Sequence, residues 1–192
     1  MIVIRQYLTS LRLLLALTLV VGLAYPATIY VVGQVAFKSA AQGSLLSANG
    51  NVIGSKLIGQ NFPGEQWFHS RPSAAGADGY DALSSSSSNA GPNEPSLLEL
   101  VNSRRAAVAK EENVDPSQVP SDAITASTSG LDPEISPEYA YLQAARVAKN
   151  HNVSITEMNS LIARHVSKRI FGFLGEPRVN VLELNNALSS LK

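Results

Sequence analysis

The sequence predicts an α+β protein with a single N-terminal transmembrane helix. One helix-rich extracytoplasmic domain, with a few short strands and long ordered loops, is expected to follow. Three observations carry this prediction: an uncharged apolar run near the N-terminus, repeated helix-start signals in the second half, and two long polar segments. The expected boundaries are a cytoplasmic N-terminus over 1–12, a transmembrane helix over 13–37, a tether over 38–50 and a soluble domain over 51–192.

Residues 13–37 contain no charged side chain, and basic residues bound the run as Arg12 and Lys38. A helix over this range is about 37 Å long, enough to cross a hydrocarbon core of about 30 Å with some tilt. A cleaved secretory signal is the alternative, but its apolar core is shorter, so an uncleaved anchor is favoured. Pro26 is expected to kink the helix. Arg5 and Arg12 precede the span, which is expected to place the N-terminus in the cytoplasm and the domain outside it, in the periplasm or at the cell exterior of a bacterium.

The composition of the soluble part excludes several classes of function. With Arg5 and Arg12 before the span, 13 of the 15 basic residues remain beside 15 acidic ones, so no basic surface for nucleic acid is expected. Cysteine is absent, which excludes disulfides and cysteine-based zinc or redox chemistry. The three histidines, His69, His151 and His165, share no metal-ligand spacing and are assigned structural roles. The acidic residues at 111, 112, 115 and 122 are expected to form a solvated rim.

The soluble domain begins with short elements and a long loop. A turn at Asn49-Gly50 ends the tether, and apolar pairs around Gly54 indicate a short strand or hairpin edge. Residues 70–95 read as a long loop that contains five consecutive serines at 84–88. Such a loop inside a domain is uncommon unless it is functional or disordered.

Four helices are expected after this loop. The pattern Ser96-x-x-Glu99 predicts a capping box and a helix to about residue 113, with Leu97, Val101 and Val108 inward. After a loop over 114–135, Ser136-Pro137 starts a helix to about 150, because serine is a good N-cap and proline a good first residue. The last two helices start at Ser154 and Asn180 by the same logic, and the sequence 175–177 (GEP) separates them. The inward residues expected in these three helices are Ala140, Ala144, Val147, Ile155, Met158, Ile162, His165, Leu184, Leu188 and Leu191.

No catalytic motif is present in the sequence. There is no G-x-S-x-G elbow, and Gly54 and Gly59 have the spacing of a P-loop without its lysine, because Gln60-Asn61 follows. No Asp-Lys-Thr-Gly phosphorylation motif and no potassium-filter motif occurs. We therefore expect no catalytic residue, no bound metal and no ATP hydrolysis by this chain alone.

The sequence resembles the KdpC family, whose members belong to the Kdp high-affinity potassium-transporting P-type ATPases. The resemblance covers nearly the whole chain and is most distinctive over 120–138 (PSDAITASTSGLDPEISPE). Further matching segments are 58–60 (IGQ), 71–74 (RPSA), 80–82 (YDA), Asn89, 91–92 (GP), 140–143 (AYLQ), 146–148 (RVA) and 175–185 (GEPRVNVLELN). One departure is the serine run at 84–88, where the family has a serine-glycine-glycine-serine core before the asparagine.

The resemblance implies an accessory, non-catalytic subunit in an inner-membrane complex that imports K⁺ with ATP. Its implied partners in the Kdp complex are the potassium-translocating subunit, the ATP-hydrolysing subunit, which is the catalytic one, and a further small subunit. Family members are described as catalytic chaperones that raise the ATP affinity of the catalytic subunit, and a glutamine matching Gln143 is given a nucleotide contact. ATP would then be bound only in the complex. A domain outside the cytoplasm conflicts with that contact, so two alternatives stay open: a role at the potassium entrance of the translocating subunit, and a helix-surface amide at Gln143 that bonds a nearby loop.

The two long loops, 70–95 and 119–135, hold most of the family-like motifs. A long polar loop can be retained for contact if a scaffold orders it. Our hypothesis is that both loops form one surface that docks the translocating subunit, with Arg71 and Asp132 as anchors. The other expected docking residues are Ser73, Asn89, Gly91, Asn93 and Ser129. A mobile serine-rich flap is one alternative, and a free-standing membrane-anchored binding or adhesion module is another.

Overall fold

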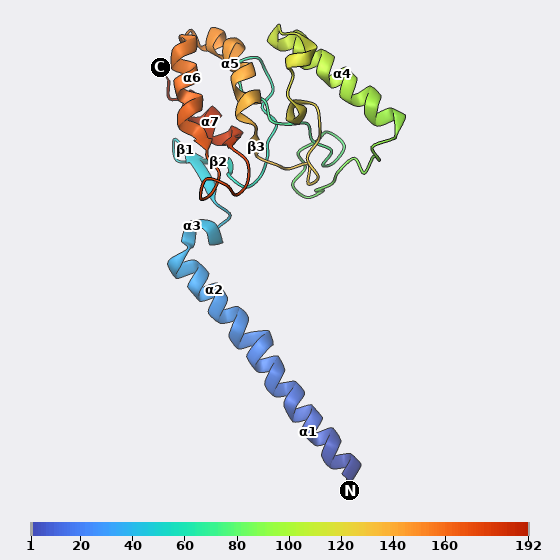
Figure 1. The fold of residues 1–192 in the computed structure, drawn as a ribbon. Helices are drawn as coiled ribbons and strands as arrows, with labels where there is room; N and C mark the ends of the chain where they lie inside the picture. Colours follow the sequence, from blue (N-terminus) through green and yellow to red (C-terminus); the bar gives the residue numbers. More distant parts are fainter. Residues whose placement is uncertain (1, 192) are drawn as a thin grey trace. The chain divides into compact units, whose positions relative to one another are not determined.

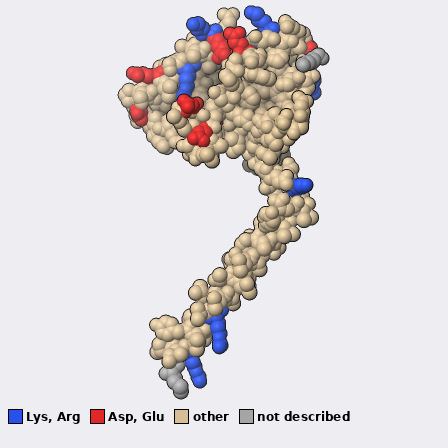
Figure 2. Space-filling model, turned by 180° about the vertical axis from the view of Figure 1, so that it is seen from behind, with Lys and Arg blue, Asp and Glu red and all other residues tan. Residues whose placement is uncertain are grey.

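The computed structural model describes residues 2–191, and the chain forms two compact units that divide between Leu45 and Leu46. The first unit is a long helix built from α1 (Ile2–Leu17), the π-helical segment η1 (Thr18–Ala24) and α2 (Tyr25–Ala36), followed by the short helix α3 (Lys38–Ala41) (Figure 1). Within the described residues, Val3–Ala36 is the one helix long and apolar enough to cross a membrane. Its surface carries no charge between Arg12 and Lys38, and it is uniformly tan there in Figure 2.

The proline effect expected at Pro26 takes the form of the π-helical turns that precede it. Pro26 lacks an amide hydrogen, and in an α-helix its ring would crowd the carbonyl group of Gly22. The wider turns of η1 end at Ala24 and give the ring space, so that α2 can begin with proline in its first turn. The helix also starts earlier than residue 13 and includes most of the segment 1–12.

A hairpin opens the second unit. Strands β1 (Leu45–Ala48) and β2 (Asn51–Ser55) pair in a two-stranded sheet around Asn49 and Gly50, which both have positive φ. Within the segment 38–50 that was expected to form a tether, residues 38–41 are helical and residues 45–48 form a strand. Alternating apolar residues are sparse in 45–48, so the strand signal is weak; the Asn-Gly turn was the stronger indication.

Helix α4 (Pro95–Glu112) starts differently from the prediction. Glu94 is its N-cap residue, Pro95 lies in the first turn, and no side chain caps the helix. The Ser96 hydroxyl donates to the Glu94 carboxylate instead, so the capping box predicted at Ser96 was wrong. The helix ends as expected at Asn113, which adopts the left-handed conformation. The residues expected to face inward, Leu97, Val101 and Val108, are half-buried, whereas Ala109 and Glu112 are buried.

The last three helices confirm their predicted N-caps. Ser136 accepts a hydrogen bond from the Tyr139 amide before α5 (Pro137–His151), Ser154 from that of Glu157 before α6 (Ile155–His165), and Asn180 from that of Glu183 before α7 (Val181–Leu188). The 114–135 segment contains two 3₁₀ turns, η2 (Pro116–Gln118) and η3 (Ser121–Ala123). Ile155 is exposed rather than inward, because it is the first residue of α6 and lies beyond the packed face.

The small sheet in the order β3-β5-β4 joins these helices. Strand β5 (Arg178–Asn180) pairs antiparallel with β3 (Glu134–Ile135) and with β4 (Val166–Ser167). Ile135 and Val166 both lie opposite Val179, which is fully buried. One core unites this sheet with α5, α6 and α7, and its fully buried side chains include Phe68, Val147, Met158, Ile162, Leu184 and Leu188.

Candidate functional site

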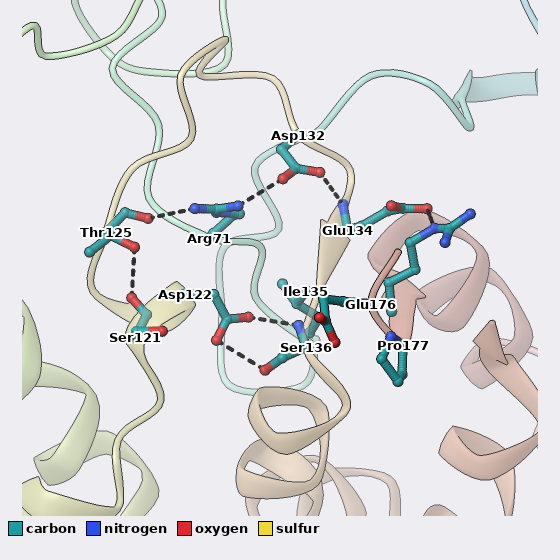
Figure 3. Close-up of a pocket in the computed structure, with 11 residues that line it drawn as sticks. Arg71, Ser121, Asp122, Thr125, Asp132, Glu134, Ile135, Ser136, Glu176 and Pro177 are labelled. Carbon is teal, nitrogen blue, oxygen red and sulfur yellow. Dashed lines mark hydrogen bonds and ion pairs between the residues drawn. The ribbon is translucent and has the colours of Figure 1, made fainter. Parts of the chain in front are cut away.

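A cavity of about 640 Å³ lies where three segments of the second unit meet (Figure 3). The segments are the start of the 70–95 loop, the 121–136 segment, and residues 176–178, which lead into β5. Polar and charged side chains line most of it: Arg71, Ser121, Asp122, Thr125, Asp132, Glu134, Ile135, Ser136, Glu176, Pro177 and Arg178. The cavity contains both anchors expected from the sequence, Arg71 and Asp132.

The Arg71–Asp132 ion pair connects the two long loops. The Arg71 Nη1 atom donates to Asp132 Oδ2 at 2.8 Å, and Nη2 donates to the Thr125 carbonyl group at 3.4 Å. The other carboxylate oxygen of Asp132 accepts from the Glu134 amide at 3.0 Å. Asp132 therefore fixes its own loop and holds the neighbouring one, and the pair remains partly open to solvent, with side-chain exposures of 23% and 30%.

Ser73 makes a second connection between the loops. Its hydroxyl donates to the Gly130 carbonyl oxygen at 2.6 Å and accepts from the Tyr80 amide at 2.7 Å. Gly130 has φ +68°, and a Cβ atom there would lie 2.7 Å from the Ala75 nitrogen. Only glycine fits this close approach, so the interlock is specific to the residue type at 130.

Tyr80 closes the first loop on itself. Its hydroxyl donates to the Arg71 carbonyl oxygen at 2.6 Å, and burial raises the pKa of Tyr80 to about 12. The hydrogen bond holds the main chain of Arg71 while the ion pair holds its side chain. The position of the guanidinium group is therefore fixed from both ends.

The serine run also takes part in the interlock. The Ser85 hydroxyl donates to the Ser129 carbonyl oxygen at 2.9 Å, and the Ser86 amide donates to the same oxygen at 3.1 Å. No residue in 84–88 has a positive φ, whereas Asn89 does. The backbone of this chain thus does not require glycine within 84–88, and serine adds a hydroxyl that the second loop uses.

The structure brings together four of the seven expected docking residues: Arg71, Ser73, Ser129 and Asp132. The other three, Asn89, Gly91 and Asn93, lie in the 84–94 stretch before α4. Asn89 bonds Ser87, and Gly91 accepts from the Glu94 amide, so both order their own loop. None of the hydrogen bonds described for these three residues reaches the 119–135 loop.

Gln143 is fully buried on α5, unlike the helix-surface amide considered from the sequence. Its Oε1 accepts from the His69 amide at 2.6 Å, and its Nε2 donates to the His69 carbonyl oxygen at 3.2 Å. Asn185 on α7 makes the same pair of bonds with Phe68: its Oδ1 accepts from the Phe68 amide and its Nδ2 donates to the Phe68 carbonyl oxygen, both at 2.9 Å. Two buried amides thus hold consecutive residues of an extended segment as a neighbouring strand would, and the bond to a nearby loop is confirmed.

Arg146 and Glu112 form a buried ion pair beside Gln143, which the sequence analysis missed. Arg146 Nε donates to Glu112 Oε1 at 2.9 Å, and Nη1 donates to the carbonyl groups of Glu65 and Trp67 at 2.6 and 2.9 Å. Burial raises the pKa of Glu112 despite the Arg146 charge, and Glu112 Oε2 has no partner among the described residues. The available signal was the three-residue spacing of Gln143 and Arg146, which places both on one helical face.

The prediction of a solvated acidic rim was therefore wrong for Glu112, and also for Asp122. The Asp122 carboxylate accepts from the Ser136 amide at 2.7 Å and from its hydroxyl at 3.0 Å, so it fixes the start of α5. Each histidine bonds a main-chain carbonyl group: His69 that of Gly64, His151 that of Gln66 and His165 that of Leu161. Among residues 2–191, no group of histidine and acidic side chains has the geometry of a metal site.

Comparisons with known proteins agree with the resemblance. The family model described as K⁺-transporting ATPase, c chain (KdpC) matches residues 7–190. The chain is 51% identical to a potassium-transporting ATPase KdpC subunit of Kineococcus radiotolerans, over 97% of this chain and 94% of that protein. It is 50% identical to a KdpC subunit of Mycobacterium tuberculosis, over 97% of this chain and 99% of that protein. It is 48% identical to a KdpC subunit of Koribacter versatilis, over 94% of this chain and 92% of that protein.

Proposed function

The chain belongs to the KdpC family of K⁺-transporting ATPase c chains, and on this premise we propose that its interlocked loops dock it onto the potassium-translocating subunit. The chain then acts as an accessory subunit that assists assembly and stabilises the potassium entrance. In this proposal the complex is completed by the ATP-hydrolysing subunit together with the further small one. Family membership also argues against a free-standing adhesion module.

One observation carries the proposal: two loops far apart in the sequence form a single ordered polar surface. The Arg71–Asp132 pair, the Ser73–Gly130 bond and the Ser85–Ser129 bond all cross between them. Buried apolar residues such as Ala75, Ile124 and Leu131 pack the loops, and these polar bonds fix their position relative to each other. A surface that is ordered in advance loses less conformational entropy when a partner binds. This order also argues against a mobile serine-rich flap.

We propose that the docking domain lies outside the cytoplasm at the inner membrane. Arg5 and Arg12 precede the candidate span, whereas Lys38 alone follows it closely, so the positive-inside bias favours this topology. A reporter fused behind the C-terminal residue tests it. Activity of an alkaline phosphatase fusion supports the proposal, and activity of a fusion that works only in the cytoplasm would overturn it.

We propose that this chain affects ATP use by the complex only indirectly, without contacting the nucleotide. The amide of Gln143 is buried, and both its polar atoms are engaged with His69 and Arg146. A nucleotide could contact it only after these bonds were broken. We therefore propose that any gain in ATP affinity arises through contacts between the subunits, and that the chain itself, which lacks Walker and phosphorylation motifs, hydrolyses no ATP.

The test is assembly of the complex with Asp132→Ala. Removing this carboxylate frees Arg71 and the Glu134 amide, so the interlock loosens while the helical core remains. We expect loss of co-purification with the translocating and ATP-hydrolysing subunits from detergent, while the full chain still melts cooperatively. Glu99→Ala, which removes an exposed acid of α4 outside both loops, is the control. Normal assembly and potassium uptake by Asp132→Ala would defeat Asp132 as an anchor.

A charge exchange separates two roles of the pair. Arg71→Asp and Asp132→Arg each place like charges opposite each other, whereas the double variant restores opposite charges. If the pair acts by holding the loops together, the double variant regains assembly. If one of the two side chains touches the partner directly, the double variant stays defective.

A further inference from the structure

The turn between β4 and β5 carries a cluster of apolar side chains that the domain leaves exposed. Ile170, Phe171, Phe173 and Leu174 have exposed fractions of 50%, 86%, 74% and 54%. Four neighbouring large apolar side chains at the tip of one turn are unusual on a soluble surface, and such patches mark contact sites. We call residues 170–174 the apolar tip.

The apolar tip has a defined conformation. The Ile170 amide donates to the Leu174 carbonyl oxygen at 2.9 Å, and the Leu174 amide donates back at 3.0 Å. The amides of Gly172 and Phe173 bond the carbonyl groups of Arg169 and Ile170 within the same turn. The turn therefore satisfies most of its backbone amides internally, which is the condition for placing a peptide segment in an environment poor in water.

Phe171 indicates that this arrangement serves something outside the domain. It has φ +54°, a left-handed conformation that is strained for a bulky residue. Packing inside the domain does not offset this strain, because Phe171 is the most exposed of the four side chains. The left-handed positions of Phe171 and the following Gly172 build the tight turn that leaves both aromatic rings outside.

Basic side chains lie directly before the tip. Lys168 has no acidic partner among the described residues, whereas Arg169 bonds Glu176 across the base of the turn. A cation beside exposed aromatic and aliphatic groups matches the interface of a bilayer, where anionic phosphates lie above acyl chains. A protein partner would also accept the apolar tip, but it offers no specific reason for the free cation.

Chain connectivity keeps the domain close to a membrane surface. The candidate span ends at Ala36, and the second unit begins at Leu46. The short segment between them, residues 37–45, reaches at most about 30 Å when fully extended. A second, weak membrane contact within this domain is then an intramolecular event with a high effective concentration, so even a small apolar tip can bind.

From these observations we propose that the apolar tip inserts into the lipid interface of the membrane that the N-terminal helix crosses. Phe171 and Phe173 enter the acyl-chain boundary, and Lys168 contacts anionic phospholipid headgroups. The tip thereby limits the orientations that the domain adopts on its tether. This proposal rests on the candidate span and is independent of the docking role of the two loops.

The test uses the full chain in vesicles of phosphatidylethanolamine and phosphatidylglycerol with brominated acyl chains, which quench nearby tryptophan. Trp67 is the only tryptophan, so Phe173→Trp in a Trp67→Phe background gives a single reporter at the tip. We expect its fluorescence to fall at least about twofold relative to unbrominated vesicles, because an interfacial side chain lies about 5–10 Å into the headgroup and acyl boundary. Lys168→Gln should reduce this quenching in anionic vesicles and have no effect in neutral phosphatidylcholine.

The matched control is Leu83→Trp in the same background, since Leu83 is 98% exposed but lies in the 70–95 loop. It should not be quenched. Equal quenching of both reporters would mean that the domain lies on lipid without using the tip, and would overturn the proposal. A tip reporter that is unquenched in vesicles but shifts to shorter wavelength when the other Kdp subunits are added would show a protein contact instead, and would equally overturn it.

Discussion

Replacing Gln143 by alanine should destabilise the domain before it affects any nucleotide. The side chain is fully buried and bonds both main-chain groups of His69, and it also accepts a hydrogen bond from Arg146. Alanine removes all three bonds and leaves a cavity between α5 and the extended segment at Phe68 and His69. The resemblance to the family suggests a nucleotide contact at this residue, so the two roles predict different outcomes.

The magnitude follows from the contacts. The variant leaves the amide and the carbonyl group of His69 without partners, and each unpaired group lowers the free energy of unfolding by up to about 3 kcal/mol. Truncation of a large buried side chain to alanine adds a cavity cost of about 2 kcal/mol or more. Partial access of water reduces these values, so we expect the free energy of unfolding to fall by about 3–5 kcal/mol. Gln143→Leu keeps most of the volume and should lose only the hydrogen-bond part.

Fluorescence of Trp67 is a local assay for this change in the full chain. Trp67 is the only tryptophan, and its carbonyl group accepts from Arg146, one helical turn from Gln143. Denaturant titration in detergent should show an earlier midpoint for Gln143→Ala. Gln66→Ala, at an exposed glutamine, should stay within about 0.5 kcal/mol of the parent chain. Unchanged stability of Gln143→Ala, together with weaker ATP binding by the assembled complex, would refute the structural role.

Three further predictions concern capping and protonation. Ser136→Ala should lower stability by about 1 kcal/mol or more, measured by thermal melting, because it removes the N-cap of α5 and a bond to Asp122; an unchanged midpoint would contradict this cap. Tyr80 keeps its proton to a pKa of about 12 when folded, against 10.0 when unfolded, so stability should fall as the pH rises above 10.0, and Tyr80→Phe should remove that component. Burial raises the pKa of Glu112 above its usual 4.5, so the folded state binds the proton more tightly than the unfolded state. The stability that this group contributes therefore falls as the pH rises through the raised value. Glu112→Gln should flatten this part of the plot of stability against pH, and an identical plot for the variant would disprove the prediction.

The helix starts could be predicted from the sequence because each depends on local chemistry. Ser136, Ser154 and Asn180 cap their helices through side chains that reach amides three residues ahead. The same logic failed at Ser96, because Pro95 already occupies the first turn and moves the helix start to Glu94. Two capping signals that overlap within a few residues cannot be separated by pattern alone.

The site could be predicted only in part, since its bonds join residues far apart in the sequence. Two long polar loops and the acid at Asp132 were visible, and the resemblance singled out Arg71. The acidic residues Glu112 and Asp122 were misjudged because the sequence does not show their partners, Arg146 and Ser136. A charged residue is buried only when a partner compensates it, and that partner comes from tertiary structure.

The segment 68–72 links the buried amides to the docking surface. Gln143 and Asn185 fix the main chain at His69 and Phe68, and Arg71 follows two residues after His69. Loss of either amide should therefore displace the Arg71 guanidinium and weaken its pair with Asp132. A defect of Gln143→Ala in the assembled transporter would then arise through the loops, with no nucleotide in contact. Dissociation constants between the chain and the other subunits can decide this: Gln143→Ala and Asp132→Ala together should reduce the binding free energy by less than the sum of their separate effects, whereas independent roles would add.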